Sequence, residues 1–251
     1  MEFPETVNNS KYDFSSDIIN IFMFLYDYSG SMHNHCHAIY SANRNFKKVF
    51  TAFEEKGSVA ISKSSFCEWY NIAPFESADH FDTSYNANGG THLYSAIVAA
   101  ATATIEYYNE LIKRLNVQAR ITFFVLSDGE DNENAYGSFE SAKKAITKLN
   151  NLDATTVFVA FDGAISSKDG ERLGFNCTRD IHSVEELVNC LGVELSRSCI
   201  EQSKSAYALK SNFFSQANQT PNSTGNNTSE SSEDAELDAI LGDWMFSADS
   251  T

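Results

Sequence analysis

The sequence lacks any apolar run near the roughly 18 residues of a membrane span, so we expect no transmembrane helix. Its first residues, MEFPETVNNSKYDF, contain neither a basic nor an apolar stretch, so we expect no secretory signal. Basic residues are few: 18 Lys and Arg stand against 34 Asp and Glu, for a formal net charge of −16. So acidic a surface repels phosphate backbones, which argues against nucleic-acid binding and suits a basic partner.

Closely spaced cysteine pairs are also missing. The five cysteines are scattered, with no CxxC and no Cys/His set of zinc spacing: Cys36, Cys67, Cys177, Cys190 and Cys199. This pattern predicts reduced thiols and a cytoplasmic protein rather than a disulfide framework. No Walker loop, GxSxG elbow or HExxH motif occurs, so we do not expect an enzyme.

What is present is an apolar, aromatic-rich body followed by a polar tail. Hydrophobic residues make up 42% of the 251 positions, enough to fill one α/β domain, which we place at 12–209. From 210 to 232 Asn, Ser, Thr and Glu dominate, so we expect a disordered linker. An acidic amphipathic helix is expected at 233–246.

Apolar runs alternate with helical patterns along the body. Strands are expected at 17–27, 58–70, 119–129, 154–163 and 175–182, and helices at 37–56, 92–115, 138–151 and 183–207. Ser183 and Glu186 form a predicted capping box before the last helix. The alternation predicts a doubly wound, mostly parallel sheet with helices on both faces.

Two of the three most apolar strands end at an aspartate, Asp27 and Asp128. Ligands of such sheets bind beyond the carboxyl ends of the strands, where strand order reverses. A carboxylate there is costly to bury unless something pairs with it. Three segments bring oxygen ligands to this edge, and their polar side chains are Asp27, Ser29, Ser31, Thr91 and Asp128.

An oxygen-only ligand set selects Mg²⁺, with Mn²⁺ and Ca²⁺ sharing the preference. Gly30 is expected to allow the tight turn that aims Ser29 and Ser31 at one point. His33 and His37 are four residues apart and have the spacing of a transition-metal pair, although we favour a polar helix start at the rim of the site.

The segments DYSGSM, GGTHLYSAI and LSDGEDN resemble, in order and separation, the three parts of the metal-ion-dependent adhesion site of von Willebrand factor A domains. The resemblance covers about 17–209 and is nearest to bacterial or bacteriophage intracellular members. It implies a sheet with one short antiparallel edge strand. It also implies that Ser29, Ser31 and Thr91 are direct ligands, and that Asp27 and Asp128 act partly through water, with ligands shifting between open and closed states.

The expected function is divalent-metal-dependent protein binding, in which a partner's Asp or Glu fills an open coordination position. Tyr28, His92 and Glu130 border the site and are expected to contact that partner. Two alternatives remain: a structural subunit of a larger assembly such as a virion, or a Mg²⁺-dependent phosphoryl-transfer enzyme. Ser29 argues against the enzyme, because it stands where haloacid-dehalogenase-type enzymes have a second aspartate.

The tail carries a second expected contact. Its apolar residues recur at the spacing of one helical face: Leu237, Ile240, Leu241, Trp244 and Met245. We favour an acidic helix that folds into a partner's groove with Trp244 as anchor. The alternative is that this helix packs back on its own domain.

Overall fold

The computed structural model describes residues 18–54, 59–115, 118–129, 131, 137–161, 163–195 and 197–198. They form one six-stranded sheet in the order β3-β2-β1-β4-β5-β6. Its strands are β1 (Ile18–Asp27), β2 (Val59–Phe66), β3 (Tyr70–Asn71), β4 (Gln118–Ser127), β5 (Thr155–Phe161) and β6 (Cys177–Ile181). Every neighbouring pair is parallel except β2 with β3. The predicted mostly parallel sheet with one short antiparallel edge strand is confirmed.

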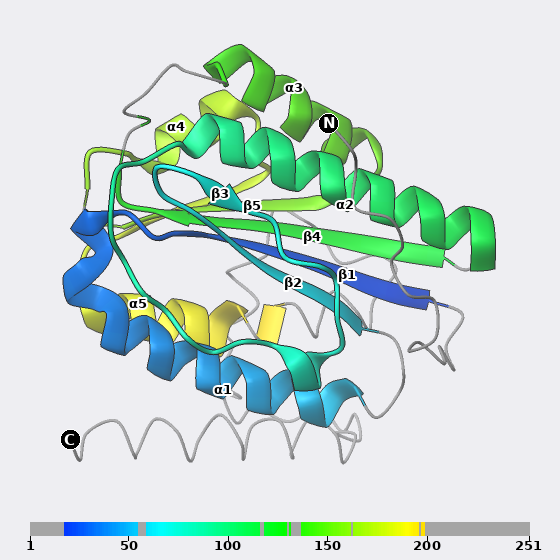
Figure 1. The fold of residues 1–251 in the computed structure, drawn as a ribbon, viewed down its shortest axis with the longest axis horizontal. Coiled ribbons are helices and arrows are strands. Elements are labelled where there is room, and N and C mark those ends of the chain that lie inside the picture. The colour runs from blue at the N-terminus through cyan, green and yellow to red at the C-terminus, as the bar shows by residue number, and fades with distance from the viewer. Residues whose placement is uncertain are drawn as a thin grey trace, which may run out of the picture.

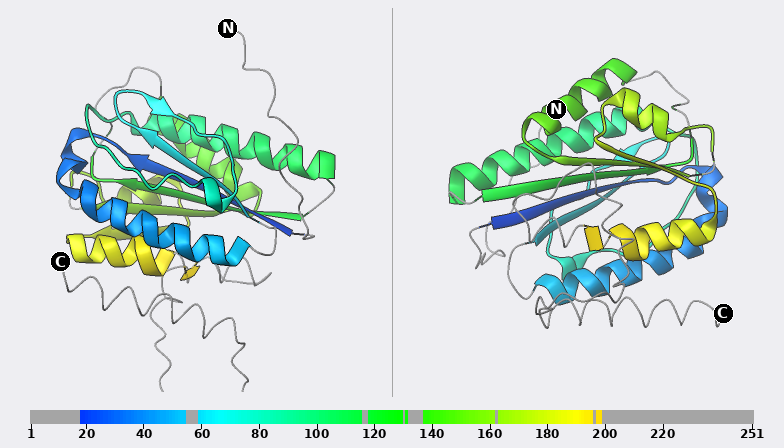
Figure 2. Two further views of the ribbon diagram at one scale, coloured as in Figure 1. Left: turned by 60° about the horizontal axis from the view of Figure 1, so that its bottom comes forward. Right: turned by 180° about the vertical axis from the view of Figure 1, so that it is seen from behind.

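Helices cover both faces of the sheet. They are α1 (Cys36–Glu54), α2 (Leu93–Leu115), α3 (Phe139–Asn151), α4 (Ser167–Leu173) and α5 (Val184–Asn189), with 3-10 turns η1 (Gly30–His35) and η2 (Ala78–His80) and the π-helical segment η3 (Cys190–Glu194). Figure 1 shows α1 and α5 on one face and α2, α3 and α4 on the other, and the views of Figure 2 agree. Among the described residues, no helix is long and apolar enough to cross a lipid bilayer.

The central strands bury both of their sides, which is why they appear in the sequence as continuous apolar runs. In β1, Phe24 and Tyr26 belong to the core beneath α1, whereas Met23 and Leu25 belong to the core beneath α2. β1 pairs with β2 on one side and with β4 on the other. Strand order therefore reverses at the β1–β4 junction, which is where this class of sheet holds its ligands.

The structure corrects several local expectations. The strand expected at 58–70 is a hairpin, because the chain turns after Phe66 and the Cys67 N–H donates to the Trp69 carbonyl at 2.8 Å. The structure also contains α4, which the sequence pattern does not predict. The helix expected from 183 changes from α-helical to π-helical at Cys190.

The capping box expected before that helix forms only in half. The Ser183 hydroxyl accepts from the Glu186 N–H at 3.1 Å. The Glu186 carboxylate, however, accepts from the N–H of His182 at 2.8 Å, one residue earlier than a box requires. The helix start is therefore capped on both sides, with the carboxylate also fixing the chain that leaves β6.

Candidate metal centre

The two aspartates lie side by side at the carboxyl edge of the sheet. Asp27 is the last residue of β1, and Asp128 follows the last residue of β4, Ser127. Since β1 and β4 are parallel neighbours, both carboxylates emerge at the same edge. Asp27 is fully buried and Asp128 is nearly so. The sheet thus places two carboxylates where the topology provides a ligand crevice.

The loop after β1 brings two hydroxyl groups to these carboxylates. The backbone N–H of Ser29 donates to Oδ1 of Asp27 at 2.8 Å, which folds the loop back over the end of the strand. The Oγ atoms of Ser29 and Ser31 are 3.0 Å apart. The Ser31 hydroxyl donates to Oδ1 of Asp128 at 2.8 Å. Four of the five predicted ligands therefore meet within hydrogen-bonding distance.

Thr91 joins them from the loop that precedes α2. Its side chain is buried, and a Cβ atom built on Gly129 would lie 3.2 Å from the Thr91 Oγ1 atom. The threonine hydroxyl is therefore next to the backbone that follows Asp128. Its loop is fixed to the β1 loop, because the Gly30 N–H donates to the Gly89 carbonyl at 2.9 Å.

Gly30 itself does not serve the purpose expected of it. It does not have a positive φ, and a Cβ atom there would meet nothing nearer than the Gly89 carbonyl oxygen at 3.5 Å. The turn is instead held by the Ser29 N–H bond to the Asp27 carboxylate and by the bond between the two loops. The expectation that the turn needs glycine at this position is wrong.

Two residues that the sequence did not single out position Asp27. The Ser127 hydroxyl donates to Oδ2 of Asp27 at 2.5 Å, and the Tyr85 hydroxyl donates to the Asp27 backbone carbonyl. Ser127 had a signal, since it is a polar residue at the end of an apolar strand. Tyr85 had none, because its contact spans 58 positions of sequence.

Burial makes the two carboxylates electrostatically costly. It raises the pKa of Asp27 to about 6, although hydrogen bonds from Ser127 and Ser29 work in the opposite direction. Burial likewise raises the pKa of Asp128, and the Ser31 hydrogen bond offsets this in part. Two desolvated acids side by side either take up a proton more readily or are stabilised in their charged form by a nearby positive charge. The carboxylate and hydroxyl oxygens are hard donors, so the residues present fit a hard divalent cation.

The neighbouring histidines do not form a second metal centre. His33 lies in the 3-10 turn η1 and His37 in α1, so the two do not share one α-helical face as the sequence suggested. The His33 ring instead donates from Nδ1 to the Ala87 carbonyl at 3.4 Å. Within the described ranges, no group of three His, Cys, Asp or Glu side chains is arranged to hold a metal ion.

The predicted rim residues have different environments. The Tyr28 hydroxyl donates to the Ser84 carbonyl at 3.2 Å, and its ring packs 4.5 Å from the Tyr85 ring, so this side chain faces inward. His92 is half-buried, and its N–H donates to the Cys67 carbonyl at 2.9 Å. Glu130 lies outside the described residues. The same holds for the tail residues Leu237, Ile240, Leu241, Trp244 and Met245.

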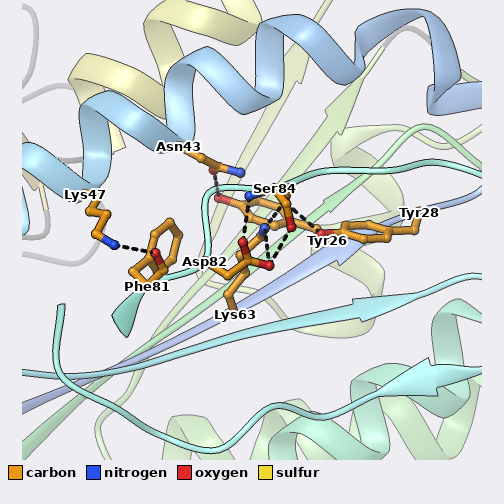
Figure 3. A network of polar contacts seen from close by, with 8 residues as sticks. All are labelled: Tyr26, Tyr28, Asn43, Lys47, Lys63, Phe81, Asp82 and Ser84. Atoms are coloured by element: carbon orange, nitrogen blue, oxygen red, sulfur yellow. Dashed lines mark hydrogen bonds and ion pairs between the residues drawn. The ribbon is translucent and has the colours of Figure 1, made fainter. Parts of the chain in front are cut away.

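A buried lysine supports the loop from the side of Tyr28. Lys63 of β2 donates to the Ser84 carbonyl, and its amine is 5.9 Å from the centre of the Tyr28 ring (Figure 3). Asp82 is 4.0 Å from the same amine and also accepts the N–H and the hydroxyl of Ser84. This network fixes the segment that supplies Tyr85.

Comparisons with solved structures identify the fold. No family model matches the sequence, and no curated protein does. The pilus adhesin SpaC of Lactobacillus rhamnosus GG matches at a TM-score of 0.56 and 11% identity, over 75% of this chain and 31% of the adhesin. The vWF domain of the type V pili tip protein Mfa5 of Porphyromonas gingivalis matches at 0.53 and 9%, over 76% of this chain and 98% of that domain.

A third neighbour carries a metal. Proximal thread matrix protein 1 of the mussel byssus, solved with a zinc-occupied MIDAS motif, matches at a TM-score of 0.50 and 16% identity, over 72% of this chain and 46% of that protein. The described chain therefore has the fold of a von Willebrand factor A domain. It spans about a third of the SpaC adhesin and under half of the byssus protein.

Proposed function

We propose that this chain is a protein-binding module that holds a divalent cation, Mg²⁺ by preference, and binds a partner's carboxylate through it. The observation that carries the proposal is the meeting of Ser29, Ser31 and Asp128 with Asp27 at the β1–β4 switch point. Neighbours with this fold include pilus adhesins and a protein with an occupied metal site.

The hydroxyl and carboxylate residues of the proposed site have different roles. Ser29, Ser31 and Thr91 offer neutral hydroxyl oxygens as direct ligands, and the two aspartates supply the negative charge. A divalent cation beside two carboxylates is roughly neutral overall, so the site does not repel one further carboxylate, which the cation itself attracts at an open coordination position. Few strong protein ligands leave room for retained waters, which suits Mg²⁺. A partner's Asp or Glu that replaces such a water makes binding metal-dependent.

The argument against an aspartyl-phosphate enzyme is Ser29, which stands where haloacid-dehalogenase-type enzymes have a second aspartate. Asp27 itself is oriented by hydrogen bonds, since Oδ1 accepts the Ser29 N–H and Oδ2 accepts the Ser127 hydroxyl. The other alternative is a structural subunit of an assembly. Gel filtration with and without a chelator distinguishes it from a metal-dependent binding module, because a structural assembly keeps its size when the metal is removed.

The first prediction tests the metal with a matched pair of threonine variants. Thr91→Ala removes a proposed ligand, whereas Thr104→Ala removes a buried hydroxyl of α2 that donates to the Ala100 carbonyl at 2.8 Å. We expect calorimetry to show Mg²⁺ or Mn²⁺ binding by the wild type and Thr104→Ala, and a loss of at least tenfold in affinity for Thr91→Ala. Circular dichroism should show that both variants fold.

Two results would overturn the proposal. One is a wild-type chain that binds no Mg²⁺, Mn²⁺ or Ca²⁺ at millimolar concentrations. The other is a Thr104→Ala variant that loses as much affinity as Thr91→Ala, since the effect would then be a general one of the helix. If the metal binds, capture of partners from the native host in Mg²⁺ and again in EDTA tests the recruitment step.

A further inference from the structure

The outer face of α1 is a basic surface on an otherwise acidic protein. Its exposed side chains recur three or four residues apart and so share one side of the helix: His37, Tyr40, Arg44 and Lys48. We call these four residues the α1 stripe. No acid occurs in α1 before its last residue, Glu54. With a net charge of −16 over the whole chain, so long an acid-free stretch of helix is unexpected.

An aromatic ring lies in the middle of this stripe. Tyr40 is 39% exposed, which makes it one of five large hydrophobic side chains exposed among the described residues. The Arg44 guanidinium carbon is 5.9 Å from the centre of its ring. The opposite side of α1 is buried against the sheet through Phe46 and Phe50. The stripe therefore combines an apolar contact with two cations that follow it along the helix, Arg44 and Lys48, and faces away from the core.

The end of the described chain lies on the same face of the sheet. α5 lies beside α1 in Figures 1 and 2, and η3 follows α5 directly and shares its core with α1. The described residues end at Ser198. The 34 residues from 199 to 232 then lead to 233–246. Extended, a chain of that length reaches about 110 Å, whereas α1 measures about 28 Å.

The sequence after this point has the opposite chemistry. No Lys or Arg follows Lys210, and residues 233–246 contain five acids: Glu233, Asp234, Glu236, Asp238 and Asp243. The same segment has its apolar residues at helical spacing, with Trp244 the largest of them. A helix of this length is marginal by itself and needs a surface to pack on. A tethered surface acts at millimolar effective concentration, so weak contacts suffice.

We propose that residues 233–246 pack on the α1 stripe of their own chain, with apolar residues on Tyr40 and acids toward Arg44 and Lys48. This chooses the alternative in which the tail packs back, and it is independent of the metal site. α3 is the competing basic surface, with Lys143, Lys144 and Lys148 exposed. It has no aromatic among its exposed side chains and lies on the other face of the sheet (Figure 1).

Tryptophan fluorescence of the full chain tests this proposal. The chain has two tryptophans, and Trp69 is 73% exposed, so Trp69→Phe leaves Trp244 as the reporter at little structural cost. We expect Trp244 to emit at shorter wavelength than free tryptophan and to be quenched several-fold less by acrylamide. Adding Arg44→Glu and Lys48→Glu should move both readings to those of free tryptophan. The matched pair Lys143→Glu and Lys148→Glu on α3 should leave them unchanged.

Three results would overturn it. The first is solvent-like Trp244 emission before any charge reversal, which would favour a groove on a partner protein. The second is an equal loss of shielding in the α1 and α3 variants, which would indicate a general charge effect. The third is shielding that disappears on dilution, since the tail would then occupy a second copy. Thermal unfolding of all variants verifies that the domain is folded throughout.

Discussion

At the scale of single residues, Gly163 is the position near the site that has the least room for a side chain. A Cβ atom there would lie 1.4 Å from the backbone oxygen of Asp128 and 2.4 Å from its carbonyl carbon. The next residue, Ala164, donates its N–H to that same oxygen at 2.9 Å. The loop after β5 thus packs directly against the backbone of Asp128. Only glycine allows this approach.

We therefore predict opposite outcomes for two glycine substitutions. Gly163→Ala must displace either its own loop or Asp128, so it should cost about 1 to 3 kcal/mol of unfolding free energy and weaken metal binding. Gly30→Ala meets only ordinary contacts and should change both by little. Urea unfolding and calorimetry measure the two effects. Equal behaviour of the two variants would mean that the close approach at Asp128 has no consequence.

At the scale of elements, a partly buried ion pair and a side-chain hydrogen bond hold the end of the π-helical segment η3. Glu194 is 3% exposed, and it accepts from Arg179 of β6 and, at 2.8 Å, from the Asn189 side chain. The wider π-turn ends at this glutamate. A single-turn insertion of this kind changes which side chains face inward. The ion pair therefore connects η3, near the end of the described chain, to the edge strand β6.

Removing that charge pair should loosen the C-terminal end of the domain. Glu194→Ala leaves a partly buried Arg179 without this carboxylate, and we predict a loss of about 2 to 3 kcal/mol. Glu171→Ala on α4 removes an exposed glutamate and should change stability by less than about 0.5 kcal/mol. Denaturant titration of both variants checks this. An equally small effect of the two would show that η3 is held by apolar packing.

The same elements show how far sequence patterns reach. β1, β4 and β5 were predictable because strands buried on both faces have continuous apolar sequences, and α2 and α3 because their apolar residues recur at helical spacing. α4 was missed because seven polar-rich residues give too short a pattern. The ion pair between Glu194, at the end of the π-turn, and Arg179 is a tertiary contact, which no local periodicity records.

Some residues of the site were likewise predictable from the sequence, and others were not. Asp27, Ser29, Ser31, Thr91 and Asp128 could be proposed from three short segments in a fixed order, and the structure brings these segments together. That they bind a metal stays a prediction. Ser127 and Tyr85 position Asp27 through tertiary contacts, so their roles emerged only from the folded chain.

At the scale of the whole molecule, Lys63 makes stability depend on pH. Burial lowers the pKa of its amine from 10.5 to about 8, and Asp82 offsets this only in part. Below pH 8 the ammonium is charged in both states, so its burial costs stability in full. Between pH 8 and 10.5 the unfolded chain holds the proton and the folded chain does not. Stability therefore rises with pH across that window.

Comparison with Lys63→Met isolates this contribution, because all other groups titrate in both proteins. We predict that the difference in unfolding free energy, wild type minus variant, increases by up to about 3 kcal/mol from pH 8 to pH 10.5. Urea unfolding at several pH values measures the difference. A difference that stays constant across this range would show that Lys63 keeps an ordinary pKa in the folded chain.

The separation of the ligand segments also bears on how the chain folds. Ser31 and Asp128 are 97 positions apart, and Thr91 enters from a third segment. A cation can be held by all of them only after β1, β4 and the start of α2 have come together. We predict that contacts between segments so far apart in sequence form after the folding transition state, and stabilising such contacts slows unfolding without speeding folding. A bound metal is therefore expected to lower the unfolding rate and so to lengthen the lifetime of the folded domain.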